Sequence, residues 1–195
     1  MRVMIVYCHP SRSSFTYNVL RRFCDGLADA GHEAVISDLY DMDFRTDMTE
    51  EEYLRETYYR ADLPLPDDVA AEQQKLQSCD AAVFIYPVFW TEAPAKLVGW
   101  FDRVWTTGFA YSPEPSMKQL DKVLCIACAG KTLQSLEETG ERQAMETVML
   151  GDRIRDRAKL REMVIFDRIT HWNAEERAAA AAAHLERAYR LGLEF

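Results

Sequence analysis

The sequence predicts a doubly wound α/β fold, in which helices cover both faces of a five-stranded parallel sheet to make a three-layer sandwich. Three observations predict it. Short apolar segments alternate with helical ones along the chain. The apolar segments are continuous, as in strands buried on both faces. The 195 residues, 48% hydrophobic and 28% charged, suit one globular domain. Right-handed crossovers then give the strand order 2-1-3-4-5.

The first strand and helix are predicted over residues 3–30. Residues 3–7 are an apolar run typical of a buried strand, and a polar turn over 9–14 follows it. The helix after this turn should end at Gly31. One face of that helix should be lined by Tyr17, Leu20, Cys24 and Leu27.

The second strand, over residues 34–39, should lead into an excursion over residues 41–67. Thr49 and Glu52 have the spacing of a capping box, which predicts a short acidic helix. Residues 60–67, which contain two prolines, are the best candidate for a linker.

The second half of the chain supplies three more strands and three more helices. A helix over 68–78 precedes a strongly apolar strand over 81–86, and a further helix has Pro94 near its first turn. The fourth and fifth strands are predicted over 122–127 and 163–166. The last helix should begin with the capping pair Asn173 and Glu176 and end at Gly192.

Doubly wound sheets bind ligands beyond the carboxyl ends of their strands, where the strand order reverses. The segments that fall there are residues 9–15, 87–92 and 128–132. This rule predicts where a ligand binds and leaves its identity open.

The first of these segments is rich in hydroxyl groups and contains no glycine-rich phosphate motif. A helix N-terminus favours an anion, and hydroxyl groups can supply the donors that glycine loops supply from the backbone. The segment therefore suggests a phosphate site near His9 and Arg12, with a simple serine cap by Ser13 or Ser14 as the alternative.

The segment after the third strand is aromatic, although loops in this position are usually polar. Pro87, Val88, Phe89 and Trp90 would form walls for a flat conjugated ring. The alternative is an apolar plug beneath the following helix.

Charge and residue spacing exclude several classes of function. The net charge of −9, without a basic block, argues against nucleic acids and anionic membranes. The N-terminal apolar run is too short for a signal peptide, and no apolar window is long enough to span a membrane. Cys125 and Cys128 should point to opposite faces of a strand, so they are interpreted as core residues. The four histidines lack metal-ligand spacing, so no metal site is expected.

The chain resembles the flavodoxin-like NAD(P)H:quinone oxidoreductase family, which includes the DT-diaphorases and the ancillary flavoproteins of glutathione-gated potassium efflux systems. The resemblance covers most of residues 1–130. It is carried by residues 7–15, 37–44, 71–76, 80–104 and 109–111.

The resemblance implies a cytoplasmic, homodimeric flavoprotein that binds FAD or FMN and transfers hydride from NAD(P)H, through flavin N5, to quinones or to similar azo or nitro acceptors. No protein nucleophile is required, and the catalytic residues are left unassigned. With the serine-rich segment, the resemblance gives as cofactor-binding residues His9, Ser11, Ser13, Ser14, Phe15, Thr16, Pro87, Val88, Phe89, Trp90, Ala129, Gly130 and Lys131.

Several alternatives stay open at this point. A regulatory, redox-sensing subunit of a membrane transport system, or a one-electron carrier, would use the same flavin. Lys131 would favour a reduced, anionic flavin by its charge. Tyr53, Tyr58 and Tyr59 either cover the flavin of a neighbouring subunit or pack locally. The arginines between residues 153 and 161 form either a solvated, salt-bridged helix face or a contact for the 2′-phosphate of NADPH.

Overall fold

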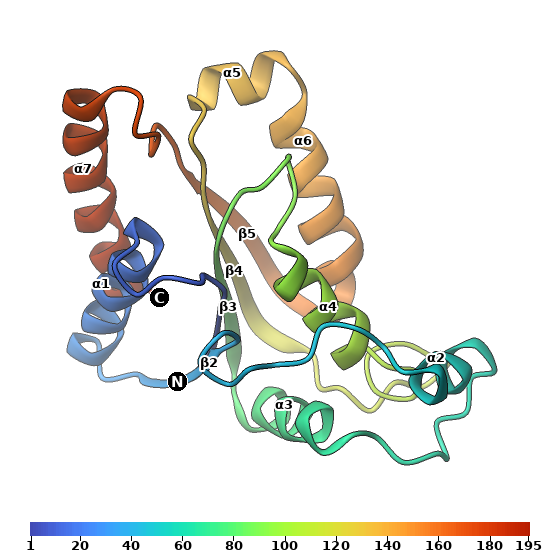
Figure 1. Cartoon of the computed structure of the whole chain (residues 1–195). Coiled ribbons are helices and arrows are strands. Elements are labelled where there is room, and N and C mark those ends of the chain that lie inside the picture. The colour runs from blue at the N-terminus through green and yellow to red at the C-terminus, as the bar shows by residue number, and fades with distance from the viewer.

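A computed structural model describes residues 1–195, and a five-stranded, all-parallel sheet lies at its centre (Figure 1). The strand order β2-β1-β3-β4-β5 confirms the predicted order. The strands are β1 (Arg2–Tyr7), β2 (Glu33–Asp38), β3 (Ala81–Pro87), β4 (Leu120–Cys128) and β5 (Ala158–Phe166).

Helices cover both faces of this sheet (Figure 1). On one face lie α1 (Phe15–Asp29) and α7 (Ala174–Leu193). On the other lie α3 (Asp67–Ser78), α4 (Ala95–Val104) and α6 (Glu141–Glu146), which continues into the π-helix η1 (Thr147–Ile154). The short helices α2 (Glu50–Thr57) and α5 (Leu133–Glu138) lie farther out, and a single 3₁₀ turn, η2 (Arg155–Arg157), precedes β5.

The sheet divides the core into two layers, because successive side chains of a strand point to opposite faces. In β3 all seven residues are buried, and they alternate between the two layers. Cys125 belongs to the layer under α4, and Cys128 belongs to the layer under α1. The predicted parity is therefore confirmed, and the two thiols lie on opposite sides of the sheet.

The predicted helix starts are confirmed at three places. The side chain of Ser14 caps α1, and that of Asn173 caps α7. At α2 both bonds of the capping box are present, with Thr49 accepting from the Glu52 N–H at 3.2 Å and Glu52 accepting from the Thr49 N–H at 2.7 Å. These ends are set by local sequence alone, because their partners lie within three residues.

Two details of the helices differ from the expectation. The buried face of α1 is centred on Val19 and Phe23, whereas Tyr17 and Cys24 lie at its edges, only partly buried. Gly192 does not end α7, which continues to Leu193. Gly192 instead lies against the backbone of α1, a close approach that a side chain would prevent.

The largest departure lies between residues 133 and 162. No motif in the sequence predicts α5 or α6, and the charge pattern of residues 153–161 allows either a solvated helix face or a contact for the 2′-phosphate of NADPH. The arginine-rich stretch, residues 153–161, spans the end of η1, a single 3₁₀ turn and the first half of β5. Arg153 and Arg157 are partly buried and point to residues far away in sequence, which no local charge pattern reveals.

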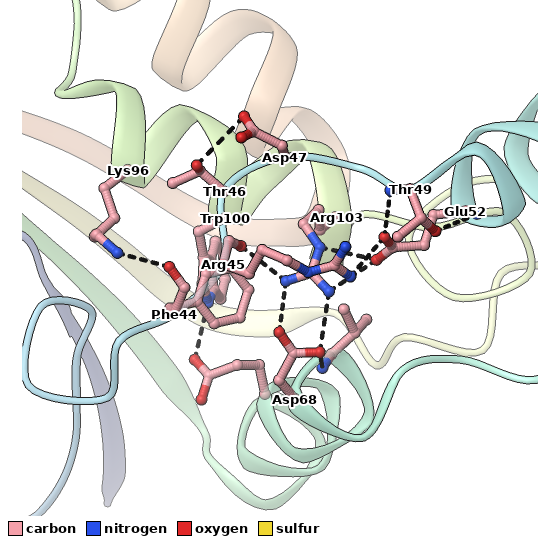
Figure 2. A network of polar contacts seen from close by, with 12 residues as sticks. Phe44, Arg45, Thr46, Asp47, Thr49, Glu52, Asp68, Lys96, Trp100 and Arg103 are labelled. Carbon is pink, nitrogen blue, oxygen red and sulfur yellow. Dashed lines mark hydrogen bonds and ion pairs between the residues drawn. The ribbon is translucent and has the colours of Figure 1, made fainter.

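The excursion over residues 41–67 is attached to α4 by a buried arginine. Arg103 contacts carboxylate oxygens of Glu52 at 2.8 Å and Asp68 at 2.5 Å, and it donates to the carbonyl of Arg45 at 2.8 Å (Figure 2). The side chain of Arg103 is completely buried; its contact with Glu52 is buried, and those with Asp68 and the Arg45 carbonyl are partly buried. The excursion is therefore a docked segment, held to α4 by charge as well as by packing.

The distribution of apolar residues among the helices bears on membrane insertion. None of the helices is long and apolar enough to span a membrane.

Candidate functional site

Loops that follow strands β1, β3, β4 and β5 meet at the carboxyl edge of the sheet and enclose two adjoining cavities. We call the first the serine cavity, with a volume of about 480 Å³, and the second the tryptophan cavity, of about 610 Å³. Both volumes are typical of small-molecule sites. The two cavities share Val88, Ala129 and Gly130.

All thirteen residues predicted to bind the cofactor line one or both cavities. The serine cavity contains the residues of the first segment together with Pro87, Val88, Phe89, Ala129 and Gly130. Trp90 and Lys131 line the tryptophan cavity. Three segments far apart in sequence are thus brought together, as the rule for doubly wound sheets predicted.

Hydrogen-bond donors gather in the serine cavity. His9 Nδ1 accepts the N–H of Ser11 at 2.9 Å, and burial lowers the pKa of the His9 imidazole. The ring is therefore neutral near pH 7, and because Nδ1 is an acceptor, Nε2 carries the proton. His9 accordingly offers one N–H donor from Nε2.

The serine hydroxyls and the start of α1 add further donors. Ser14 Oγ accepts the N–H of Tyr17 at 3.1 Å as the helix cap, and its own O–H is left to donate. The Ser11 and Ser13 hydroxyls lie 2.8 Å apart. The N–H groups of Phe15 and Thr16 have no partner within the helix, because they belong to its first turn. The serine cap and the anion-binding arrangement, weighed as alternatives, thus coexist.

A positive charge that the sequence did not nominate also lines the serine cavity. Arg177, in the first turns of α7, has a buried Nε atom without a hydrogen-bond partner. A buried, unpaired charged donor is unfavourable unless something accepts its proton. This nitrogen is therefore a donor that could serve an anionic group in the cavity. In the sequence Arg177 belongs to a helix-forming stretch, so only the packing of α7 on α1 reveals its position.

Arg12, by contrast, does not line either cavity. Its guanidinium contacts Asp41 at 2.7 Å and Asp38 at 3.8 Å, on the side of the excursion. These carboxylates compete for Arg12, so its place beside a phosphate stays a prediction. Arg177 is the arginine that lines the serine cavity.

The other end of the site is aromatic. Phe89 is half exposed, and Trp90 is 99% exposed at the mouth of the tryptophan cavity. Trp172, from the loop after β5, is 98% exposed and lines the same cavity. A fully exposed tryptophan is uncommon, and two at one cavity indicate a surface that receives a flat apolar partner.

The loop after β5 completes the wall, although the sequence did not nominate it. Ile169 and His171 line the serine cavity, and Thr170 and Trp172 line the tryptophan cavity. The loop is bonded to the one after β4, with the N–H of Ile169 donating to the Ala129 carbonyl at 3.0 Å. The same strand-end rule would have found these residues, had it been applied to the fifth strand.

Lys131 is paired rather than free. Its Nζ lies 2.6 and 2.8 Å from the two carboxylate oxygens of Glu141, and this contact lowers the pKa of Glu141. The carboxylate offsets the charge through which Lys131 was expected to act on a bound group. Glu141 is therefore ionised at neutral pH and does not serve as a proton donor there.

The thiol in the site is inert. Cys128 lines the serine cavity, and burial raises its pKa to about 12. A thiol with that pKa stays protonated at neutral pH and is a poor nucleophile. No cluster of histidine, cysteine and carboxylate side chains has the geometry of a metal site.

Taken together, the two cavities fit an elongated molecule with an anionic tail and a planar ring. Donors and a positive charge lie at the serine end, and apolar and aromatic walls lie at the tryptophan end. No protein nucleophile accompanies them, so the residues are arranged to bind and orient a group rather than to form a covalent bond with it.

Comparisons with known proteins agree with this architecture. A family model described as flavodoxin-like fold matches residues 1–190. The structure of an NAD(P)H:quinone oxidoreductase from Methanothermobacter marburgensis is similar, with a TM-score of 0.93 and 42% sequence identity, over 99% of this chain and 96% of that one.

Two curated relatives match over a shorter length. Rat NAD(P)H dehydrogenase [quinone] 1 is 38% identical over 57% of this chain, and ribosyldihydronicotinamide dehydrogenase [quinone] of Pongo abelii is 34% identical over 71%. The chain spans 45% of the rat protein and 68% of the Pongo abelii protein. An FMN complex of an NADH-azoreductase from Bacillus anthracis, 17% identical with a TM-score of 0.68, shares the fold.

Proposed function

The chain belongs to the flavodoxin-like fold family, and from this premise we propose that it is a flavin-dependent NAD(P)H oxidoreductase that reduces quinones or similar acceptors. The 42% identity to a quinone oxidoreductase over nearly the full length of both chains supports the activity. We further propose that residues 1–195 form one flavin-binding domain.

The observation that carries the proposal is the chemical difference between the two ends of the joined cavities. The serine cavity holds donors and the unpartnered Arg177 Nε, which fit the phosphate of FMN or the diphosphate of FAD. Pro87, Val88 and Phe89 continue from it as an apolar wall that fits an isoalloxazine ring. The donor set and the wall therefore fit a flavin at its two chemically different ends.

When bound, a flavin would supply the redox chemistry, the transfer of hydride from NAD(P)H to a two-electron acceptor. The residues of the chain would bind and orient it. His9 Nε2–H, the serine hydroxyls and Arg177 would hold the phosphate end, and the aromatic turn would cover one side of the ring. The oppositely charged side chains of Lys131 and Glu141 form an ion pair at the tryptophan cavity, where the acceptor would enter.

The proposed acceptors are flat aromatic molecules. Trp90 and Trp172 would stack on such rings at the mouth of the tryptophan cavity. Tyr53, Tyr58 and Tyr59 are all exposed, so local packing does not account for them, and we propose that they face a second copy of the chain in a homodimer.

The decisive experiment identifies the flavin. Purified protein is denatured, the released small molecule is identified by mass, and reconstituted protein is assayed for NADPH and NADH oxidation with menadione. We expect FAD or FMN and rapid oxidation of at least one nicotinamide. Protein that stays colourless after incubation with both flavins would refute the proposal, and a bound flavin that NAD(P)H does not reduce would favour a carrier instead.

A double substitution tests the walls. Replacement of both Phe89 and Trp90 by alanine should raise the dissociation constant for flavin, because the ring loses its stacking surface. Replacement of the exposed Leu160, on the far half of β5, by alanine serves as the control. Wild-type flavin content in the double variant would contradict this assignment.

A further inference from the structure

The segment that presents Trp90 is a tight turn of unusual composition. Phe89 and Glu92 form an isolated antiparallel bridge, with the N–H of Phe89 donating to the Glu92 carbonyl at 2.8 Å and the N–H of Glu92 donating back at 3.0 Å. Trp90 and Thr91 occupy the two central positions, and their φ angles are 52° and 65°. Positive φ at both positions is the pattern of a type I′ turn.

Such turns normally contain asparagine, aspartate or glycine, because other side chains crowd the backbone at positive φ. Threonine is especially unfavourable there, since its Cβ is branched. The local sequence therefore does not stabilise this conformation by itself. Residues held in sparsely populated regions persist only where the surrounding structure holds them, and such residues gather at ligand sites.

The contact that holds the turn comes from the π-helix η1, 61 residues further along the chain. Arg153 Nη1 lies 2.9 Å from Glu92 Oε1, and the same oxygen accepts the N–H of Ala93 at 2.7 Å. The Arg153 side chain is 14% exposed and that of Glu92 is 40% exposed, so solvent screens this ion pair only in part. The pair fixes Glu92, the last residue of the turn, at the point where the chain leaves for α4.

Arg153 is itself held on three sides. Its guanidinium lies over the Phe101 ring at 5.2 Å, its Nη1 lies 3.3 Å from the sulfur of Met149, and its carbonyl accepts the indole N–H of Trp105 at 2.6 Å. A charged side chain with both its head and its backbone fixed is a rigid support. Because the Arg153 guanidinium is already paired with Glu92, the structure argues against Arg153 as the contact for the 2′-phosphate of NADPH.

We propose that Arg153 is a positioning residue, which acts through Glu92 to keep the Trp90–Thr91 turn in its left-handed conformation and so to place Trp90 at the mouth of the tryptophan cavity. The part of this inference that concerns flavin or acceptor binding rests on the proposed function. The structural part, which is the coupling between η1 and the turn, does not depend on the proposed function. Loss of the pair would let the turn relax toward ordinary negative φ and move Trp90 away.

Amide hydrogen exchange of the flavin-free protein tests the coupling directly. In Arg153→Met and in Glu92→Gln, exchange over residues 88–93 should quicken about tenfold, while exchange in β3 and β4 stays at the wild-type rate. Arg153→Lys, which keeps the charge, should give an intermediate rate. Arg155→Met is the matched control, because Arg155 is an exposed neighbour without an ion pair, and it should exchange as the wild type does.

Wild-type exchange over residues 88–93 in both Arg153→Met and Glu92→Gln would overturn the proposal. So would a quickening spread over the whole chain, which indicates general destabilisation, or an Arg153→Lys rate equal to that of Arg153→Met. Glu92→Gln keeps the test available if Arg153→Met does not fold, since Glu92 is at the surface and glutamine has its shape.

A second measurement separates the two proposals. Titration with FMN and with FAD should show a dissociation constant about tenfold higher in Arg153→Met and Glu92→Gln than in the wild type or Arg155→Met. If the wild type binds neither flavin, the proposed function fails while the exchange experiment still decides the coupling. If exchange changes but neither the flavin dissociation constants nor the KM for menadione of the reconstituted proteins does, the positioning role is refuted and the flavin function stands.

Discussion

At the scale of single residues, Arg177 carries the clearest signature of a missing partner. Its Nε atom is buried and donates to nothing within the chain, and its side chain lines the same cavity as the serine hydroxyls. A charged donor is rarely buried without a hydrogen-bond partner in a folded protein, because the solvation free energy lost on burial is then not recovered. Its residence in the cavity is therefore best explained by a ligand that carries negative charge.

Arg177→Met keeps the aliphatic stem and removes the guanidinium. We expect the dissociation constant for flavin to rise roughly 10- to 150-fold, because a hydrogen bond to a charged group contributes about 1.5–3 kcal/mol. The free energy of unfolding of flavin-free protein should not fall, since an unpaired buried group has been removed. Titration and urea unfolding measure the two quantities.

The control for this substitution is Arg190→Met on the same helix, where the arginine is exposed and pairs with Glu186. It should leave the flavin constant unchanged. An Arg177→Met protein that binds flavin as tightly as the wild type would show that the orphaned nitrogen has another cause.

Single residues also show how far the sequence could go. The nominated serines, aromatic residues and Gly130 line the cavities because strand ends and helix starts are encoded locally. Arg177 was missed because its type and spacing are those of an ordinary helix, and His171 and Trp172 were missed because the strand-end rule was not applied to the fifth strand. Nothing in the neighbouring residues says which cavity they will face.

At the scale of elements, the packing of α1 on α7 is set by two glycines. A Cβ on Gly26 would lie 2.0 Å from the Tyr189 carbonyl oxygen, and one on Gly192 would lie 2.2 Å from the Phe23 carbonyl oxygen. Both contacts are with backbone, which cannot move aside as a side chain does. The two helices can approach this closely only because glycine stands at both crossing points.

Gly26→Ala should therefore lower the free energy of unfolding by about 1–3 kcal/mol, the usual cost of overfilling a packed interior. The matched control is Gly151→Ala in η1, where a new Cβ meets only the Glu146 carbonyl oxygen, at 4.0 Å. That control should be neutral or stabilising, as alanine is in a helix. Urea unfolding of the three proteins checks this, and equal midpoints would contradict the packing argument.

A second element, the docked excursion, depends on Arg103. Removing one member of a fully buried ion pair costs about 3–5 kcal/mol. We expect Arg103→Met to lower the free energy of unfolding by less than this, because Glu52 keeps Arg45 at 2.7 Å and Asp68 is 37% exposed, although both lose their common partner. Chemical denaturation, followed by circular dichroism, measures it.

Arg60→Met provides the comparison, since Arg60 pairs with Asp62 at the surface of the same excursion. Its unfolding midpoint should equal that of the wild type, because solvent screens exposed pairs. An Arg103→Met protein as stable as Arg60→Met would mean that packing alone holds the excursion.

At the scale of the whole molecule, buried carboxylates set the response to acid. The hydrogen bond from Arg103 lowers the pKa of Asp68. Burial acts to raise the pKa of Glu52, but hydrogen bonds from Thr49 and Arg103 outweigh it, and the pKa lies below its usual value. The pKa of Asp167 is lowered in the same way, by the Leu133 N–H and the charge of Arg168, against its burial.

The sign of the pH dependence follows. Groups whose pKa is lower in the folded than in the unfolded chain bind fewer protons when folded, so their stabilising contribution is complete above the ordinary values of 3.8 and 4.5. It is lost as the pH falls through the lower, folded values. The free energy of unfolding should thus decrease steadily below about pH 4.5.

The substitution at Arg103 makes this prediction specific. The difference in unfolding free energy between wild type and Arg103→Met should shrink between pH 7 and pH 3, because the wild type loses its paired carboxylates over that range. Unfolding curves at several pH values test it. A difference that stays constant with pH would show that the carboxylates of Glu52 and Asp68 do not carry the effect.

The sequence by itself determined the order of the strands, the helix starts at Thr49 and Asn173, and the place where a ligand should bind, and it narrowed the first helix start to Ser13 or Ser14. These features depend on runs of apolar residues and on contacts between residues a few positions apart, so they are written locally. Cys125 and Cys128 were likewise separated correctly by parity alone.

Only the tertiary structure decided which charges meet. Arg153 pairs with Glu92, and Arg103 pairs with Glu52, in each case across more than fifty residues of sequence. Arg12 pairs with Asp41, and Lys131 pairs with Glu141. The energy of an ion pair depends on distance through space and on burial. Both are set by how helices and loops pack, and the order of residues along the chain does not record them.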